Sequence, residues 1–283
     1  MILQALAEYY ERKRESDPDS IPEWGFEQKE IPFVIVLSKE GEFLNIEDTR
    51  DAEAGRKRGR TFTVPEAEKR TSGVLANLLW DKPDYALGFV PEGKKAGRIA
   101  KQHEAFRVKI EAVFGEDPDD VGIRALLTFL RKGDFDHIWS HPVWEEVVTA
   151  TGPYVAFRLA GEDRLVSERP DVVRRIQASV GTDGASRAQC LVTGEEGPMA
   201  TLHPSIKGVR GAQSVGANIV SFNLSAFQTH GREQGANAPV SEQAAFAYTT
   251  ALNTLLDRDS PTNAHVGDTT VVFWAERGNE VQN

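Results

Sequence analysis

Residues 203–256 read HPSIKGVRGAQSVGANIVSFNLSAFQTHGREQGANAPVSEQAAFAYTTALNTLL, a glycine-rich polar segment that ends in an amphipathic helix. Between Gly197 and Arg232 there is no Asp or Glu, although the whole chain carries 43 acidic residues. A segment that lacks negative charge and contains Lys207 and Arg210 suits a phosphate-rich partner. An acid-poor sheet core would give the same pattern, so both interpretations stay open at this point.

The loop at residues 207–216 (KGVRGAQSVG) mixes glycines with cationic and hydrogen-bonding side chains. Glycine permits positive φ and close backbone approach, so successive N–H groups can surround a phosphate. The cations would neutralise that phosphate, and the Gln and Ser side chains would reach a base edge. The spacing matches neither GxxxxGK[ST] nor GxGxxG, and a plain glycine-rich turn is the alternative. The residues expected to bind nucleic acid here are Lys207, Gly208, Arg210, Gly211, Gln213 and Ser214.

The segments after this loop predict a strand, a helix and a closing strand. A buried strand is predicted at residues 217–222. Ser241 is expected to cap a helix in which apolar residues recur at helical spacing. Residues 269–275 predict the last strand, and the order suggests a right-handed crossover unit, with antiparallel pairing as the alternative.

The rest of the chain predicts a mixed arrangement of helices and hairpins. Helices are expected at residues 1–14, 98–109 and 121–130, a strand at 61–64, and hairpins at 31–37 with 42–47 and at 154–159 with 164–167. The predicted fold class is α+β, a mixed and largely antiparallel sheet with flanking helices. The small-residue stretch 179–186 predicts a boundary between an α+β lobe, residues 1–178, and a second lobe, residues 187–283, or a loop within one continuous domain.

A second group of polar residues, Arg70, Ser72 and Asn77, is a further candidate for contact with a nucleic-acid groove, and an ordinary loop is an equal alternative. The charge run at residues 56–60 is expected to be a solvated face, with phosphate contact as the other interpretation. His137 and His141 have metal-ligand spacing, but no further ligand pattern accompanies them.

The bulk composition limits the class of protein. The formal net charge of −10 argues against a generally basic nucleic-acid coat, so binding would depend on local patches. Cys190 is the only cysteine, which excludes an internal disulfide and suits a reducing cytoplasm. No apolar run has transmembrane length. No cofactor is expected.

Several long motifs resemble the large subunit of the type I-C CRISPR Cascade, the Csd family. They are CLVTGEEGPMATLHP (190–204), LHPSIKGVRGAQSVGANIV (202–220), SFNLSAFQTHGREQGANAPVSEQAAFAYTTALNTLL (221–256) and GDTTVVFWAE (267–276), with MILQALAEYYERK at the start of the chain. The resemblance covers essentially the whole chain. It corresponds to the N-terminal portion of the family's longer chain, so the family's helical C-terminal part is expected to be lacking.

The resemblance implies a non-enzymatic subunit of an RNA-guided surveillance complex. Such a subunit recognises the short motif beside the target in double-stranded DNA and promotes duplex opening and R-loop formation. It also supports the displaced strand and recruitment of a separate helicase-nuclease. Its partners would be the target duplex, the backbone subunits that hold the guide RNA, and that helicase-nuclease. In the family, a short loop comparable to residues 70–77 precedes an aspartate-containing turn, which residues 80–85 match here.

Three other functions are alternatives to this one. A structural adaptor without DNA contact would leave the loop cations without a role. A serine hydrolase with Ser214 as nucleophile and a nearby histidine as base lacks the strand-serine-helix order that a nucleophile elbow requires. A nuclease would need acidic residues clustered near the basic loop, and none are clustered there.

Overall fold

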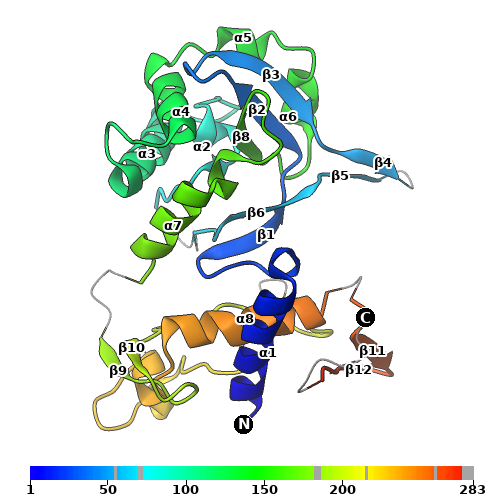
Figure 1. Ribbon diagram of the computed structural model, residues 1–283, viewed down its shortest axis with the longest axis vertical. Coiled ribbons are helices and arrows are strands. Elements are labelled where there is room, and N and C mark those ends of the chain that lie inside the picture. The colour runs from blue at the N-terminus through cyan, green and yellow to red at the C-terminus, as the bar shows by residue number, and fades with distance from the viewer. Residues whose placement is uncertain are drawn as a thin grey trace. The chain divides into compact units, whose positions relative to one another are not determined.

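The computed structural model describes residues 1–53, 56–68, 70, 73–181, 186–213, 216–257 and 260–275. The chain divides into two compact units, and each is described on its own. Gly25–Val180 form the middle unit, whereas Met1–Trp24 and Gly181–Asn283 form the terminal unit. Figure 1 labels the elements of both.

A four-stranded mixed sheet forms the centre of the middle unit. Its strand order is β3 (Phe43–Asp48), β2 (Phe33–Leu37), β8 (Val155–Leu159) and β7 (Trp80–Asp81). β2 pairs antiparallel with β3 and parallel with β8, and β8 pairs antiparallel with β7. The two inner strands read FVIVL and VAFRL, the nearly continuous apolar runs expected of strands that are covered on both faces.

The two faces of this sheet bury different side chains, because successive residues of a strand point to opposite sides. Phe33 and Ile35 of β2 pack in the larger core with Phe106 and Leu126, which lie on helices. Val34 faces the smaller core, which also contains Trp80, Phe62, Val64 and Leu165. The alternation along β2 therefore positions helices over one face and a short two-stranded sheet over the other.

Helices cover the larger core. The described helices of this unit are α2 (Pro83–Ala86), α3 (Ala96–Phe114), α4 (Val121–Lys132), α5 (Asp136–Trp139), α6 (Trp144–Thr149), η2 (Val166–Glu168) and α7 (Pro170–Ser179). α4 has well-defined ends: the Asp120 carboxylate accepts from the N–H groups of Gly122 and Ile123 at 2.8 and 3.0 Å, and Gly133 ends the helix at φ 62°.

Two smaller sheets complete the middle unit. β1 (Phe26–Glu30) pairs antiparallel with β6 (Thr61–Pro65). β4 (Asp51–Glu53) pairs antiparallel with β5 (Arg56–Arg58), so the charge run at residues 56–60 begins in a hairpin.

The terminal unit is built on two packed helices, α1 (Ile2–Ser16) and α8 (Glu242–Leu255). Leu6 and Tyr10 of α1 lie in one core with the alanine-rich face of α8, including Ala245 and Ala251. As predicted, Ser241 caps α8, and its Oγ accepts from the N–H of Ala244 at 3.2 Å.

Short strands and turns surround this helix pair. The described elements are η1 (Pro18–Ser20), β9 (Arg187–Gln189), β10 (Glu196–Pro198), η3 (Ser225–Phe227), η4 (Gln234–Asn237), β11 (Asn263–Val266) and β12 (Thr269–Val272). β9 pairs with β10 and β11 with β12, both antiparallel. Cys190 is buried, and its Sγ accepts from the N–H groups of Val192 and Ser241 at 3.4 and 3.2 Å.

The predicted α+β class and the hairpin at residues 31–37 with 42–47 are confirmed. The predicted hairpin at 154–159 with 164–167 is wrong. β8 pairs with β2 and β7, whereas residues 166–168 form η2. The geometry of η2 is stabilised by Glu168, whose carboxylate accepts from the N–H of Leu165 at 2.7 Å. Both edges of β8 are occupied by strands distant in sequence, which local patterning could not reveal.

The strand predicted at residues 217–222 is also wrong. Only Ala217 makes a bridge, to Ile206, and Ile219 is 49% exposed. β12 pairs antiparallel with β11, which also follows the helix, so the crossover interpretation is wrong and residues 217–222 do not pair with the closing strand in either direction. A run of apolar residues in a glycine-rich segment resembles a strand, but a strand forms only where a neighbouring strand can pair with its backbone hydrogen-bonding groups.

The two compact units differ from the lobes suggested by the sequence. The division falls at Val180 and Gly181, but the first 24 residues belong with the terminal unit. The physical reason is the packing of α1 on α8. Because α1 and α8 are far apart in the sequence, local patterns did not indicate that they pack together.

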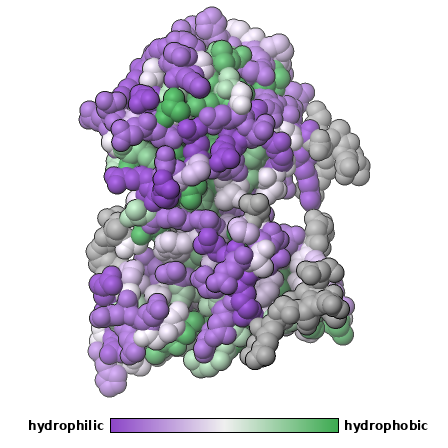
Figure 2. Space-filling view, viewed as in Figure 1, coloured by the Kyte–Doolittle hydropathy of each residue, from purple (hydrophilic) through white to green (hydrophobic). Residues whose placement is uncertain are grey.

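The surface has little continuous apolar area on the face drawn in Figure 2, where hydrophilic residues predominate over both units. A partner that binds this face would meet mainly polar groups. No helix within the described residues has the length and apolar character needed to cross a membrane.

Candidate nucleic-acid interface

The start of the glycine loop, residues 207–216, lies against the last turns of α8. The backbone N–H of Lys207 donates to Oδ1 of Asn253 at 2.7 Å. The amide Nδ2 of the same Asn253 donates to the carbonyl of Ser205 at 3.2 Å. The side chain of Asn253 therefore holds the start of the loop against the helix, and the bridge between Ile206 and Ala217 closes the loop.

Two glycines of the loop are required by its path. Gly208 has φ 77°, and a Cβ there would stand 3.1 Å from the carbonyl oxygen of Leu256. Gly216 has φ 104°, and a Cβ there would stand 2.8 Å from the carbonyl oxygen of Ile206. Gly211 also has positive φ, 79°, but a Cβ there would meet no described atom within 4 Å. The ends of the loop are thus packed, and its middle faces open space.

Lys207, Arg210 and Gln213 are all exposed. Nη1 of Arg210 donates to the carbonyl of Gly267 at 2.9 Å, in the turn of the β11–β12 hairpin. This bond uses one N–H of a guanidinium that carries five, so the others can serve a ligand. Ser214, the remaining predicted contact, lies outside the described residues.

Replacing Asn253 with alanine should detach the loop from α8. The loss of two hydrogen bonds at an exposed site should lower the free energy of unfolding by about 1–2 kcal/mol. Amide hydrogen exchange at residues 205–213 should become faster at the same time. Thr254→Ala is the matched control, because its hydroxyl only donates to the Thr250 carbonyl within α8. Unchanged exchange in Asn253→Ala would mean that other contacts position the loop.

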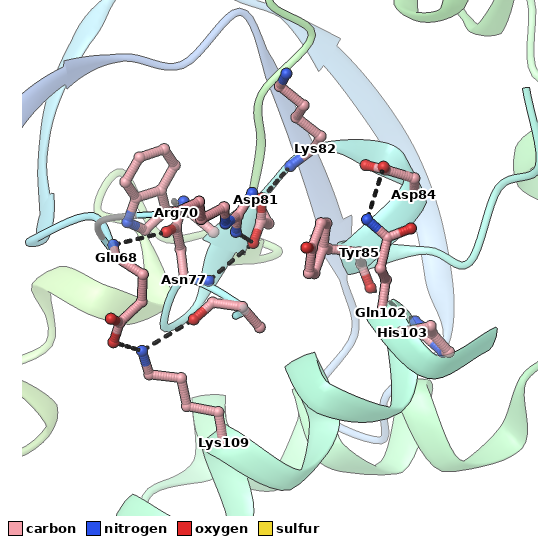
Figure 3. A network of polar contacts seen from close by, with 12 residues as sticks. Glu68, Arg70, Asn77, Asp81, Lys82, Asp84, Tyr85, Gln102, His103 and Lys109 are labelled. Atoms are coloured by element: carbon pink, nitrogen blue, oxygen red, sulfur yellow. Dashed lines mark hydrogen bonds and ion pairs between the residues drawn. The ribbon is translucent and has the colours of Figure 1, made fainter. Parts of the chain in front are cut away.

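The second predicted group, around Arg70 and Asn77, lies in the middle unit and is organised by Asp81. Asp81 is fully buried, and Figure 3 shows its carboxylate at the meeting point of several donors. Oδ2 accepts from the guanidinium of Arg70 and, at 2.8 Å, from the backbone N–H of Asn77. Oδ1 accepts from the N–H of Lys82 at 2.8 Å. The aspartate therefore joins the start and the end of the loop to β7.

Asn77 is itself buried, with 3% of its surface exposed. Its Oδ1 accepts from the N–H of Glu68 at 3.0 Å. Two residues later Leu79 has φ 64°, an uncommon conformation for a branched apolar side chain, which its burial maintains. Asn77 thus has a structural position, from which its amide does not reach the surface.

Further contacts fix the same loop. The Arg70 guanidinium lies 4.1 Å from the centroid of the Tyr85 ring, a cation–π contact. Lys109 of α3 donates to the carbonyl of Ala76 at 2.9 Å and pairs with Glu68. These contacts, drawn in Figure 3, tie the loop to α2 and α3.

Burial raises the pKa of the Asp81 carboxyl, and the Arg70 ion pair and the N–H groups of Asn77 and Lys82 act against that rise. The opposing effects explain why Arg70 is needed: a buried carboxylate without a cation is strongly destabilising. Arg70 and Asn77 are therefore engaged within the protein. Ser72 lies outside the described residues.

Other candidates from the sequence have structural contacts. Nε2 of His141 lies 3.0 Å from Oδ1 of Asn45, and its ring packs edge-on against Phe43. Among the described residues, no group of three or more His, Cys, Asp or Glu is placed to hold a metal. His203, a base considered for a hydrolase, is buried, and its Nδ1 lies 2.6 Å from the Tyr248 hydroxyl.

Two residues that organise these loops, Asp81 and Asn253, were missed in the sequence. Asp81 lies within the turn at residues 80–85, and Asn253 lies within the helix that Ser241 caps. Asn237 accepts from the N–H and hydroxyl of Thr229, both at 3.0 Å. A polar residue inside an otherwise apolar helix was a usable indication for Asn253. No local pattern marks the partners of Asp81, because they come from different elements.

Comparison with known proteins gives one family. A family model described as CRISPR-associated protein (Cas_Csd1) matches residues 6–283. No curated protein matches the chain. The match covers both units and includes the glycine loop and the Asp81 network.

Proposed function

The chain belongs to the CRISPR-associated Csd1 family, and from this premise we propose that it recognises the short flanking motif of a double-stranded DNA target. Family membership makes it a subunit of a Cascade complex with other Cas proteins. In our proposal it is a non-catalytic type I-C large subunit that promotes duplex opening and R-loop formation. It also supports recruitment of the helicase-nuclease.

The observation that carries this proposal is the glycine loop at residues 207–216. It lies in a segment without acidic residues, its start is held on α8, the bridge between Ile206 and Ala217 closes it, and its middle faces open space at Gly211. Lys207 and Arg210 would contact phosphate, and Gln213 would reach or wedge between base edges. A fixed loop loses little conformational entropy when it enters a groove, so more of the contact energy remains for binding.

The division of labour follows from the chemistry of RNA-guided recognition. Pairing with the guide reads the target sequence, so the protein needs to read only a few flanking base pairs. Opening the first steps of the duplex costs about 1–2 kcal/mol of stacking per step. A loop inserted beside those steps can offset part of this cost. The supporting role of Arg70 and Asn77 is then to hold the loop around Asp81, with direct DNA contact by the partly exposed Arg70 as the secondary proposal.

Replacing Lys207 with alanine should weaken duplex binding on all sequences and lower the salt slope of binding by about one. Gln213→Ala should instead change the preference for the flanking bases, by about 1–3 kcal/mol. The measurement is a duplex titration at two salt concentrations with assembled complex, comparing a correct flank with a scrambled one.

The decisive form of this titration uses a triple variant that combines Lys207→Ala, Arg210→Ala and Gln213→Ala. If the triple variant assembles and no longer distinguishes the two flanks, the loop is the reader. If discrimination survives, the reader lies elsewhere, and residues 70–77 become the next candidate. Unchanged binding to every duplex would favour an adaptor without DNA contact.

A further inference from the structure

A second exposed structure in the terminal unit, the tight turn at residues 229–232, is independent of the glycine loop. Thr229 and Arg232 form an antiparallel bridge, and the N–H of Arg232 donates to the Thr229 carbonyl at 2.9 Å. The two central residues, His230 and Gly231, have φ 51° and 72°. Positive φ at both central positions defines a type I′ turn, which favours Asn or Gly at the first of them.

Histidine is, with Asn and Asp, among the non-glycine residues enriched at positive φ, so His230 fits the first central position of the turn. Here His230 and Arg232 are both exposed, one at the tip of the turn and the other beside it. The turn therefore presents two hydrogen-bonding side chains, one of them cationic, to solvent.

The turn is held rigidly by Asn237. Its Oδ1 accepts from the N–H and Oγ1 of Thr229, both at 3.0 Å, and its Nδ2 donates to the carbonyls of Arg232 and Gln234 at 3.1 and 3.0 Å. The four bonds use all the strong hydrogen-bonding capacity of one amide. The turn is thus preorganised before any ligand arrives.

The charge around the turn favours an anion. Arg232 closes the acid-free segment that begins at Gly197, and its side chain has no ion-pair partner among the described residues. The nearest acid in sequence is Glu233, which is also exposed.

The turn and the glycine loop lie in the same compact unit. The loop is bound to Asn253 near the end of α8, whereas Asn237 precedes the Ser241 cap at the beginning of the helix. This unit therefore carries two separate groups of exposed cationic and hydrogen-bonding side chains.

We propose that the turn at residues 229–232 is a second contact for the phosphate backbone of duplex DNA, beside the bases that the glycine loop reads. Arg232 and His230 donate to phosphate oxygens and carry no sequence information. This inference rests on the proposed function of the glycine loop. The second contact sets the orientation of the duplex, so that the loop meets the correct base pairs.

The test uses assembled complex with Arg232→Ala and duplexes that carry long or short flanks. On a long flank the variant should lose about tenfold in affinity, equally for correct and scrambled motifs, and the salt slope should fall by about one. On a flank shortened to the motif alone, the variant and the unmodified protein should bind alike, because the phosphates that Arg232 contacts are then absent. Arg174→Ala, an exposed arginine paired with Asp171 in the middle unit, is the matched control for the lost charge.

The outcomes separate the two proposals. Equal affinity of Arg232→Ala and the unmodified protein on long flanks would overturn the second contact, and so would a loss that persists on short flanks or on single-stranded DNA alone. A uniform loss in Arg232→Ala, together with intact flank discrimination in the triple loop variant, supports the turn and removes the glycine loop as reader. His230→Gly keeps the backbone of the turn and should give a smaller loss of the same kind.

Discussion

Replacing Arg70 with alanine should lower the free energy of unfolding by about 3–5 kcal/mol at neutral pH, because it leaves the Asp81 carboxylate buried without its cation. The N–H groups of Asn77 and Lys82 would remain, but they carry only partial charge. The cation–π contact with Tyr85 would be lost as well. Urea unfolding of the isolated chain at pH 7 measures the effect.

The pH dependence of this loss identifies its cause. Burial already raises the pKa of Asp81, and removing Arg70 would raise it further. A carboxyl with a raised folded pKa contributes stability below its unfolded pKa of about 3.9, and this contribution is lost as the pH rises through the folded pKa. The difference between Arg70→Ala and the unmodified protein should therefore be small near pH 4 and grow toward neutral pH.

Two controls make the Arg70 result specific. Arg174→Ala removes an exposed arginine with an acidic partner and should cost at most about 1 kcal/mol. Adding Asp81→Asn to Arg70→Ala should recover a large part of the loss, since the buried charge is then absent. An Arg70→Ala loss of less than about 1 kcal/mol at pH 7 would contradict the role of the ion pair.

Replacing Gly235 with alanine should cost roughly 2–3 kcal/mol, because the new Cβ has no room. A Cβ built there would overlap the carbonyl oxygen of Ala200 and stand 3.0 Å from that of Thr201. The N–H of Gly235 donates to the same Thr201 carbonyl at 3.2 Å, so backbone packs directly on backbone. Since neither partner is a flexible side chain, η4 must shift, and the turn at residues 229–232 must shift with it.

Gly197→Ala is the matched control in the same unit. Its Cβ would stand 3.5 Å from Cβ of Ser241, an ordinary van der Waals distance. The free energy of unfolding of this variant should therefore lie within about 0.5 kcal/mol of that of the unmodified protein. Urea unfolding measures both variants, and hydrogen exchange at residues 229–237 follows the turn. Equal stability of the two variants would show that η4 relaxes without cost.

The local elements of this protein could be predicted from its sequence where periodicity and capping agreed. The helix capped by Ser241 and the hairpin of β2 and β3 depend on neighbouring residues, so their sequence patterns were sufficient. The acid-free segment and its glycine loop were also visible, because charge and glycine spacing are properties of the sequence itself. The long motifs were sufficient to indicate the family, which the match over residues 6–283 confirms.

Contacts between distant residues decided the rest. The partners of β8, the packing of α1 on α8 and the donors around Asp81 all join segments that no local period connects. For the same reason Arg70 and Asn77, which resembled ligand-binding residues in the sequence, have structural contacts in the folded chain. A side chain's hydrogen-bonding capacity can be read from its identity, but whether protein or ligand uses it depends on which groups folding brings within about 3 Å.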